Sequence, residues 1–408
     1  MNKKIHVFTF FQYVTSLINS LKGFIFVIFL TPEAFGLWRT FYTTINYARY
    51  FDLGISTFSY YRGLITSLRK SYTFLIWRSV FILIFPSSIF FSLLAYKYAV
   101  IFDEKLIIMM FAIFFLSFSI QLYASIASIY KINKNINSLI IMDVSLASVS
   151  LVLSCILGFF FNLKGILSGM VVSYVIVFIY LYFKEKNNFH TKTRPIKYFS
   201  VGKRFCSIVP KSFIYYLPGA VSVLFINVDL WFGANSVSNE IAGYFGLFMG
   251  FQILVSIAPS SISTWFYIED ASGLNNSMKK LVKVCSINLI ASFFVALIGL
   301  LGSYLLITNF LNEYMQTYYF ILAIFWTLPF FALRNILVNI LIVRNQSLQF
   351  SSIVLLLICI KILLFSLNAF DLNLFINIVQ ISNIAFTIAI IGLIVISNKK
   401  IQGLKKLR

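Results

Sequence analysis

Long blocks of hydrophobic residues, separated by short polar joints, follow one another along the whole chain. The hydrocarbon core of a bilayer is about 30 Å thick, and a helix of about 20 residues crosses it. Blocks of this length predict membrane-spanning helices throughout the sequence. Twelve spans are predicted, six at 6–30, 36–61, 77–101, 106–130, 138–161 and 164–183, and six at 206–232, 241–268, 284–308, 315–342, 348–369 and 373–396.

The composition supports this pattern. Of the 408 residues, 60% are hydrophobic and 11% are charged, whereas about a quarter of the residues in a soluble domain are charged. So few polar residues cannot cover the surface of a soluble fold of this size. We therefore expect an all-α polytopic membrane protein.

The charges are distributed unevenly between the two ends of the predicted spans. The chain has 33 Lys and Arg against 12 Asp and Glu, a net charge of +21. Of the 33 cations, 25 fall in the two termini and in the alternate joints that share their side of the membrane. The positive-inside rule then places both termini in the cytoplasm. These basic joints also suit binding to anionic headgroups of membrane lipids, and a nucleic-acid partner is not expected.

Several kinds of chemistry lack the residues they require. Four Cys and two His show no metal-ligand or disulfide spacing, so neither a metal site nor a catalytic triad is predicted. No GxxxxGK[ST] motif occurs, which excludes ATP hydrolysis by a P-loop. We expect no catalytic residue and no cofactor. A transporter with this sequence would draw energy from a gradient of H⁺ or Na⁺, or from consumption of its product.

The two halves of the chain resemble each other at one joint. Residues 33–38 read EAFGLW and residues 240–245 read EIAGYF, an offset of 207 residues. Because each half has an even number of spans, the repeat is parallel, with a pseudo-two-fold axis along the membrane normal. The predicted parts are a six-helix lobe at 1–183, a cytoplasmic linker at 184–205, a second six-helix lobe at 206–397 and a basic tail at 398–408.

Ionisable residues inside the spans are the main candidates for function. Each costs about 2.5–3.5 kcal/mol at the bilayer centre, so each should face water or a partner. The cations outnumber the acids, which favours an anionic substrate. The candidates are Lys22, Arg49, Arg334 and Lys361 for substrate binding, and Asp52, Asp143 and Asp229 for coupling or gating.

These candidates carry alternative interpretations. Arg49 and Asp52, three residues apart on one expected helix face, either neutralise each other or bind a phosphate together. Arg334 either turns inward after Pro329 or extends its side chain to the cytoplasmic interface. Lys361 lies in the middle of its span, so its side chain reaches the interface less easily. Asp143 suits a structural bond to Lys131, Lys134 or the backbone.

The repeat offset also pairs Lys22 with Asp229 as a hypothetical latch between the lobes. Tyrosines in spans two and seven suit either sugar contacts or packing: Tyr42, Tyr47, Tyr50, Tyr60, Tyr61, Tyr215 and Tyr216.

Residues 30–38 (LTPEAFGLW), residues 50–56 (YFDLGIS) and Tyr61-Arg62 resemble the opening of polysaccharide exporters. The chain is similar to O-antigen flippases of the Wzx type, in the superfamily that also holds multidrug (MATE) extruders and the lipid II flippase. The resemblance implies a V-shaped, MATE-like transporter with two six-helix lobes in a bacterial inner membrane. Its substrate would be an undecaprenyl-pyrophosphate-linked oligosaccharide, and an O-antigen polymerase and a chain-length regulator would be partners.

Two alternatives stay open. A multidrug exporter of the same fold would favour acidic or aromatic cavities for cationic drugs. A membrane enzyme, such as an O-antigen polymerase or a lipid-linked glycosyltransferase, would need a sizeable external loop, and every predicted external joint is short.

Overall fold

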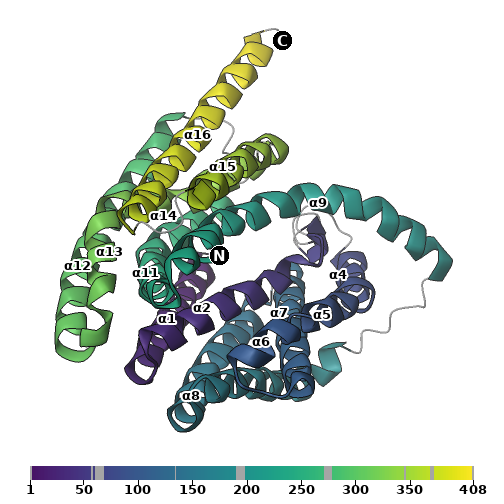
Figure 1. Ribbon diagram of the computed structural model, residues 1–408. Coiled ribbons are helices and arrows are strands. Elements are labelled where there is room, and N and C mark those ends of the chain that lie inside the picture. Colours follow the sequence, from purple (N-terminus) through teal and green to yellow (C-terminus); the bar gives the residue numbers. More distant parts are fainter. Residues whose placement is uncertain are drawn as a thin grey trace. The chain divides into compact units, whose positions relative to one another are not determined.

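The computed structural model describes residues 2–56, 58–59, 69–133, 135–189, 198–270, 278–343, 346–367 and 372–406, and all regular secondary structure in these ranges is helical (Figure 1). The predicted all-α class is therefore confirmed. In the first half, the elements are α1 (Asn2–Phe29), α2 (Pro32–Asn46), the 3₁₀ turn η1 (Tyr47–Tyr50), α4 (Arg69–Ser79), the π-helix η2 (Val80–Ile84), α5 (Phe85–Ser92), α6 (Ala95–Ile101), α7 (Leu106–Ile132) and α8 (Ile136–Phe189).

The second half begins with the long helix α9 and ends with α16 (Figure 1). Its elements are α9 (Tyr198–Val228), the π-helix η3 (Asp229–Ala234), α10 (Asn235–Val237), α11 (Asn239–Asp270), α12 (Met278–Phe310), the 3₁₀ turn η4 (Asn312–Tyr314), α13 (Met315–Ile324), the 3₁₀ turn η5 (Phe325–Thr327), α14 (Leu328–Val343), α15 (Ser347–Leu367) and α16 (Leu372–Lys406).

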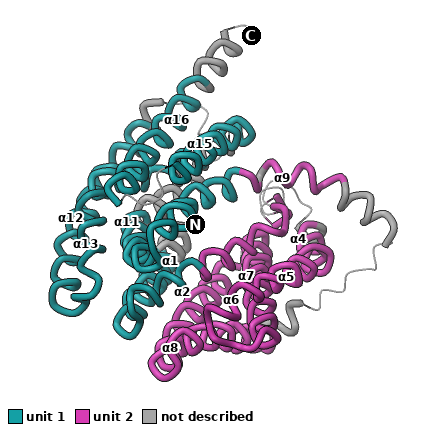
Figure 2. The backbone as a smooth tube through the Cα atoms, viewed as in Figure 1, with its two compact units in different colours: residues 1–40, 218–408 teal, residues 41–217 magenta. Residues whose placement is uncertain are grey.

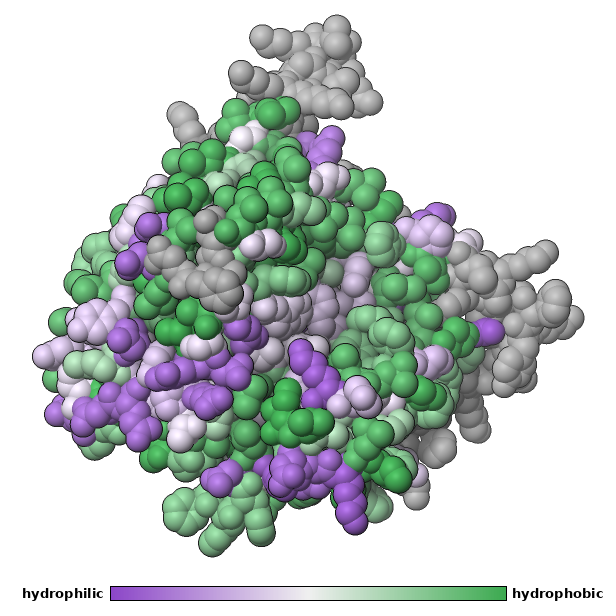
Figure 3. Space-filling model, viewed as in Figure 1, coloured by the Kyte–Doolittle hydropathy of each residue, from purple (hydrophilic) through white to green (hydrophobic). Residues whose placement is uncertain are grey.

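In the described ranges, helical segments occupy most of each predicted span. Among the described residues, nine helical stretches are long and apolar enough to cross a membrane. One of them, within α8, holds both the fifth and the sixth predicted spans, and the second and eighth predicted spans correspond to α2 with its continuation and to α11. Hydrophobic residues also cover most of the face drawn in Figure 3. The chain is a multi-pass membrane protein.

The joint between the fifth and sixth spans lies inside α8. Asn162 has a φ of +50° and a ψ of −132°, which ends one helix and begins the next. The two arms then pack closely, because a methyl group at Gly165 would lie 1.8 Å from the Leu157 carbonyl oxygen and one at Gly169 would lie 2.6 Å from the Ser154 Cα. Gly165 and Gly169 form a small-xxx-small pattern, which lets membrane helices approach at backbone distance.

Two compact units divide the chain, and the colour changes within α2 and within α9 in Figure 2. The first unit holds residues 1–40 and 218–408, and the second holds residues 41–217. These boundaries differ from those of the lobes predicted from the sequence, because α1 and the start of α2 pack with the second half of the chain. The predicted lobes, linker and tail stay a prediction.

The repeated joint has the same local structure in both halves. The Thr31 hydroxyl accepts a hydrogen bond from the Ala34 amide (3.3 Å), and the Ser238 hydroxyl accepts one from the Ile241 amide (3.0 Å). Each hydroxyl caps a helix that begins one residue later. Thr31 and Ser238 are 207 residues apart, as are their two donors, so the repeat extends from sequence to capping geometry.

The two repeated helices contact each other through their equivalent glycines. A methyl group at Gly36 would lie 2.0 Å from the Asn239 carbonyl oxygen, and one at Gly243 would lie 1.9 Å from the Pro32 carbonyl oxygen. Pro32 and Asn239 are themselves 207 residues apart, so the contact is reciprocal. Reciprocity of this kind is the property of a two-fold axis. We call this contact, formed by Pro32, Gly36, Asn239 and Gly243, the glycine seam.

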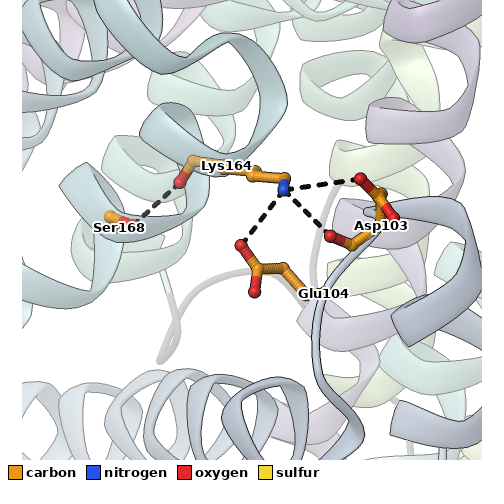
Figure 4. A network of polar contacts seen from close by, with 4 residues as sticks. All are labelled: Asp103, Glu104, Lys164 and Ser168. Atoms are coloured by element: carbon orange, nitrogen blue, oxygen red, sulfur yellow. Dashed lines mark hydrogen bonds and ion pairs between the residues drawn. The ribbon is translucent and has the colours of Figure 1, made fainter.

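Joints predicted on the same side of the membrane also contact one another. In the first unit, the Tyr314 hydroxyl donates a hydrogen bond to the Leu30 carbonyl (2.9 Å). In the second unit, the Lys164 ammonium lies 3.3 Å from the Glu104 carboxylate and donates to the Asp103 carbonyl at 2.9 Å, as Figure 4 shows. Both contacts join two loops that the alternation of spans assigns to one face.

Candidate functional site

The seven candidate residues divide between the two units. Lys22, Asp229, Arg334 and Lys361 belong to the first unit, and Arg49, Asp52 and Asp143 belong to the second. Asp229, Arg334 and Lys361 are each at most 9% exposed. Asp229 pairs with Lys361, and Lys361 and Arg334 lie over two neighbouring phenylalanine rings. We call these three residues the buried charge centre.

Lys361 and Asp229 form the ion pair at this centre. The Lys361 Nζ lies 2.6 Å from Asp229 Oδ1, and both side chains are almost fully buried. The same ammonium donates to the Phe225 carbonyl at 3.3 Å and lies 4.0 Å from the centroid of the Phe225 ring. An ammonium has three donors, so carboxylate, carbonyl and ring together replace its hydration. Lys361 is therefore held inside the helix bundle of the first unit.

The backbone around Asp229 departs from the α-helix. Asp229 is the first residue of the π-helix η3, which follows α9 directly. π-Helical turns are rare and occur frequently at functional sites. The carboxylate that pairs with Lys361 thus sits where the helix geometry changes, one turn after Phe225.

Arg334 joins the centre through aromatic rings. Its guanidinium carbon lies 4.5 Å from the Phe331 ring centroid and 5.9 Å from that of Phe386. The ring centroids of Phe386 and Phe225 are 4.6 Å apart at an interplanar angle of 36°, so two tilted rings in contact connect Arg334 with Lys361. Desolvated cation–π contacts contribute about 2 kcal/mol. One carboxylate and two cations give the three residues of the buried charge centre a formal net charge of +1.

Lys22, on α1, is also buried in the first unit, at 7% exposed. The ion pair that the structure describes for Asp229 is the one with Lys361. The hypothetical latch between Lys22 and Asp229 therefore stays a prediction. Lys361, which the sequence offered only as a separate candidate, is the residue that meets Asp229.

The expectation that Arg49 and Asp52 share one helix face is wrong, because the helix predicted over 36–61 is interrupted. α2 ends at Asn46 and is followed by the 3₁₀ turn η1. Leu53 and Gly54 then adopt φ values of +52° and +76°, which a continuous right-handed helix does not contain. A methyl group at Gly54 would also lie 2.5 Å from the Tyr216 Cβ, so glycine serves both the turn and the close approach of α9.

Asp52 restarts the helix after this interruption. Its Oδ1 accepts the Gly54 amide and its Oδ2 accepts the Ser56 amide, both at 2.9 Å. This is N-capping, in which a carboxylate satisfies amides that have no partner inside the helix. The Ser212 hydroxyl of α9 donates to the Leu53 carbonyl at 2.9 Å and fastens the turn from outside. The Asp-Leu-Gly stretch is therefore a capped helix break.

Arg49 lies in η1, immediately before the break, and its side chain is exposed. The guanidinium carbon lies 5.3 Å from the centroid of the Tyr50 ring. An arginine within a predicted span, such as Arg49 in 36–61, faces water because lipid would not solvate its charge. Asp143 accepts a hydrogen bond from the Tyr123 hydroxyl at Oδ1. It also interacts electrostatically with Lys131, one of the partners expected from the sequence.

Sequence reasoning missed the aromatic part of the site. Phe225 and Phe386 are both at most 2% exposed and stand between the two cations of the buried charge centre. Phenylalanine is abundant, at 47 residues, so no single ring could be distinguished. The glycine seam did leave a signal in the sequence, because Gly36 and Gly243 occupy equivalent positions of the internal repeat.

Comparison with solved structures places this fold among known transporters. The chain is similar to the lipid II flippase MurJ in an inward closed conformation, with a TM-score of 0.65, 13% identity and coverage of 97% of this chain and 89% of MurJ. It is also similar to a multidrug resistance MATE transporter of the MOP superfamily in an outward-facing conformation (TM-score 0.63, 15% identity, 100% and 97% covered). An inward-facing MATE transporter gives a TM-score of 0.57 at 15% identity, with 96% of each chain covered.

The fold of this chain is thus the one shared by MATE transporters and MurJ. No protein-family model and no curated protein sequence matches the chain.

Proposed function

We propose that the chain is a flippase that moves an undecaprenyl-pyrophosphate-linked oligosaccharide across the bacterial inner membrane, from the cytoplasmic to the periplasmic leaflet, by alternating access. The observation that carries the proposal is the charge inside the membrane. The buried charge centre has a net charge of +1, and Arg49 is exposed at a helix break. The fold shared with the lipid II flippase MurJ supports a lipid-linked substrate.

The chemistry of the substrate requires such cations. A pyrophosphate loses its hydration when it leaves water, which costs far more than thermal energy unless protein groups replace the lost contacts. A guanidinium binds two phosphate oxygens at once. We propose Lys22, Arg49, Arg334 and Lys361 as the residues that stabilise the headgroup at successive stages, while the polyprenyl chain stays in lipid.

Asp229 is the best placed of the three acids for coupling to H⁺ or Na⁺. Protonation of its carboxylate would remove the ion pair with Lys361 and release the ammonium toward an incoming phosphate. Asp52 and Asp143 are engaged in a helix cap and in a bond with Tyr123. We therefore assign structural roles to these two acids and the gating role to Asp229.

The basic joints place both termini in the cytoplasm in this proposal. The substrate and the surrounding membrane lipids are the first partners, and an O-antigen polymerase and a chain-length regulator would act on the product. These partners follow from the resemblance in residues 30–62.

Deletion of the gene, followed by complementation, tests the proposal in cells. The deletion strain should lose surface polysaccharide and accumulate lipid-linked oligosaccharide in the cytoplasmic leaflet. The wild-type gene should reverse both changes, and a Lys361→Met variant expressed at an equal level should not. Shortened polysaccharide without accumulation would contradict a flippase and indicate a polymerase.

A multidrug exporter is the second candidate, because MATE transporters share the fold. Such a protein would protect a sensitive strain against cationic dyes, and Asp229→Asn would abolish the protection. The cation-rich centre argues for the anionic substrate. Dye efflux by the wild-type protein, with unchanged polysaccharide in the deletion strain, would reverse the preference.

A further inference from the structure

A row of aromatic rings runs beside Arg49 in the second unit. The ring centroids of Tyr47 and Tyr50 are 5.4 Å apart, and those of Tyr50 and Tyr216 are 6.0 Å apart. Tyr216 in turn stacks on Phe213, at 5.5 Å and an interplanar angle of 29°. We call Tyr47, Tyr50, Phe213 and Tyr216 the tyrosine shelf. Two of its members come from η1 and two from α9.

The shelf keeps part of its surface exposed. Tyr47, Tyr50 and Tyr216 are half-buried, Phe213 is exposed, and Arg49 beside them is exposed. Packing tyrosines of the first unit behave differently: Tyr314 is 1% exposed between two aromatic neighbours. The shelf is therefore a surface and not part of a core.

The shelf lies at one end of an apolar stretch. Tyr216 is the first residue of Tyr216–Val237, which is long and apolar enough to cross a membrane, so the shelf lies near the level of the lipid headgroups. The backbone at the shelf is also irregular, with positive φ at Leu53 and Gly54. Non-helical backbone at membrane depth is tolerated where it is buried in protein, as Asp52 and Gly54 are, or where it lines a water-filled cavity. Substrate sites of repeat-built transporters occur beside such interrupted helices.

We propose that the tyrosine shelf binds the sugar next to the pyrophosphate, with Arg49 holding the phosphate. A pyranose ring has apolar C–H faces and a rim of hydroxyls, and tyrosine offers a matching apolar face and a polar end. Arg49 lies 5.3 Å from the Tyr50 ring, so both groups reach one sugar phosphate. This inference rests on the proposed function, and it assigns recognition of the sugar to residues that the charge argument does not use.

The site is held rigid by its neighbours. Ser212 fastens α9 to the Leu53 carbonyl, and Gly54 lets the Tyr216 backbone approach. Two segments more than 150 residues apart in sequence thus present their rings together. A rigid aromatic surface binds with little loss of side-chain entropy.

Competitive binding measured by native mass spectrometry tests the shelf separately from transport. The purified full-length protein is offered undecaprenyl pyrophosphate with and without an attached oligosaccharide. The wild type should prefer the sugar-bearing lipid by at least about tenfold. Tyr50→Leu and Tyr216→Leu should abolish this preference while binding of the sugar-free lipid is kept, and Tyr50→Phe, which retains the ring, should keep most of it.

Tyr96→Leu is the matched control, because Tyr96 is an 81% exposed tyrosine of the same unit on α6. It should leave the preference unchanged. An equal preference in the wild type and in both leucine variants would overturn the shelf. The same protein samples are assayed for flipping in proteoliposomes. A sugar preference without flipping would contradict the proposed function and support sugar binding at the shelf. Flipping without a sugar preference would support the proposed function and contradict sugar binding at the shelf.

Discussion

At the scale of single residues, the ion pair of Lys361 and Asp229 connects stability to function. Two charges 2.6 Å apart inside the first unit stabilise each other only while both are present. Removing one partner of a buried pair leaves an uncompensated charge and costs about 3–5 kcal/mol, whereas apolar replacement of both is often nearly neutral. The pair is therefore an element that a single protonation can switch.

We expect Lys361→Met and Asp229→Asn each to lower the free energy of unfolding in detergent by about 3–5 kcal/mol. The double variant Lys361→Met/Asp229→Leu should recover most of this loss but not the flipping activity. Lys164→Met, which breaks a solvent-exposed pair, serves as the control and should cost much less. A double variant as unstable as the sum of its singles would show that the pair does not act as a unit.

Asp52 gives a second prediction at this scale. Because its carboxylate caps two amides, Asp52→Ala should destabilise the protein by about 1 kcal/mol and speed hydrogen exchange at the Gly54 and Ser56 amides. Asp52→Asn, which keeps an acceptor oxygen but cannot carry the charge, should retain most of the flipping rate. Loss of flipping in Asp52→Asn with unchanged hydrogen exchange would instead make Asp52 a coupling residue.

At the scale of elements, the glycine seam and the helix break show where backbone geometry determines the fold. In the seam, α2 and α11 approach through equivalent glycines. At the break, η1 and α9 meet through Gly54 and Ser212. Both sites depend on glycines, which have no side chain. Gly36 and Gly243 are the glycines of the internal repeat, and Gly54 belongs to the stretch 50–56 that resembles polysaccharide exporters.

Gly36→Ala and Gly243→Ala should each destabilise the protein, because the added methyl group meets a backbone carbonyl at 2.0 Å or less. We expect a loss of about 1–3 kcal/mol, the usual cost of overpacking. Gly250→Ala, on the same helix α11 as Gly243 but with open space around it, should be neutral or stabilising by up to about 1 kcal/mol. Thermal unfolding of the three variants makes the comparison, and equal effects at all three positions would argue against the seam.

Much of the fold could be predicted because membrane insertion leaves a strong hydrophobic pattern. The α8 joint at Asn162 and the caps at Thr31 and Ser238 fall at predicted joints. The interruption at 47–54 could not be predicted, because hydropathy does not distinguish a continuous span from a broken one. The partner of Asp229 was also missed, because pairing between η3 and α15 depends on packing and leaves no spacing rule in the sequence.

At the scale of the whole molecule, topology is the first property to test. In a variant without native cysteines, a cysteine at exposed Glu313 should react with an impermeant maleimide in intact spheroplasts. A cysteine at exposed Lys283 should react only after permeabilisation. Glu313 lies in η4 and Lys283 lies near the start of α12, at joints that the charge pattern assigns to opposite sides. The opposite labelling pattern would reverse the orientation and, with it, the direction of transport.

Flipping of a fluorescent undecaprenyl-pyrophosphate-linked oligosaccharide in proteoliposomes measures the proposed transport itself. Bleaching by an impermeant reductant counts the lipid in the outer leaflet. The wild-type protein should make nearly all of the lipid accessible, and Arg49→Gln or Lys361→Met should reduce the rate at least about tenfold. A rate equal to that of empty liposomes, with a correctly folded wild-type protein, would contradict the account.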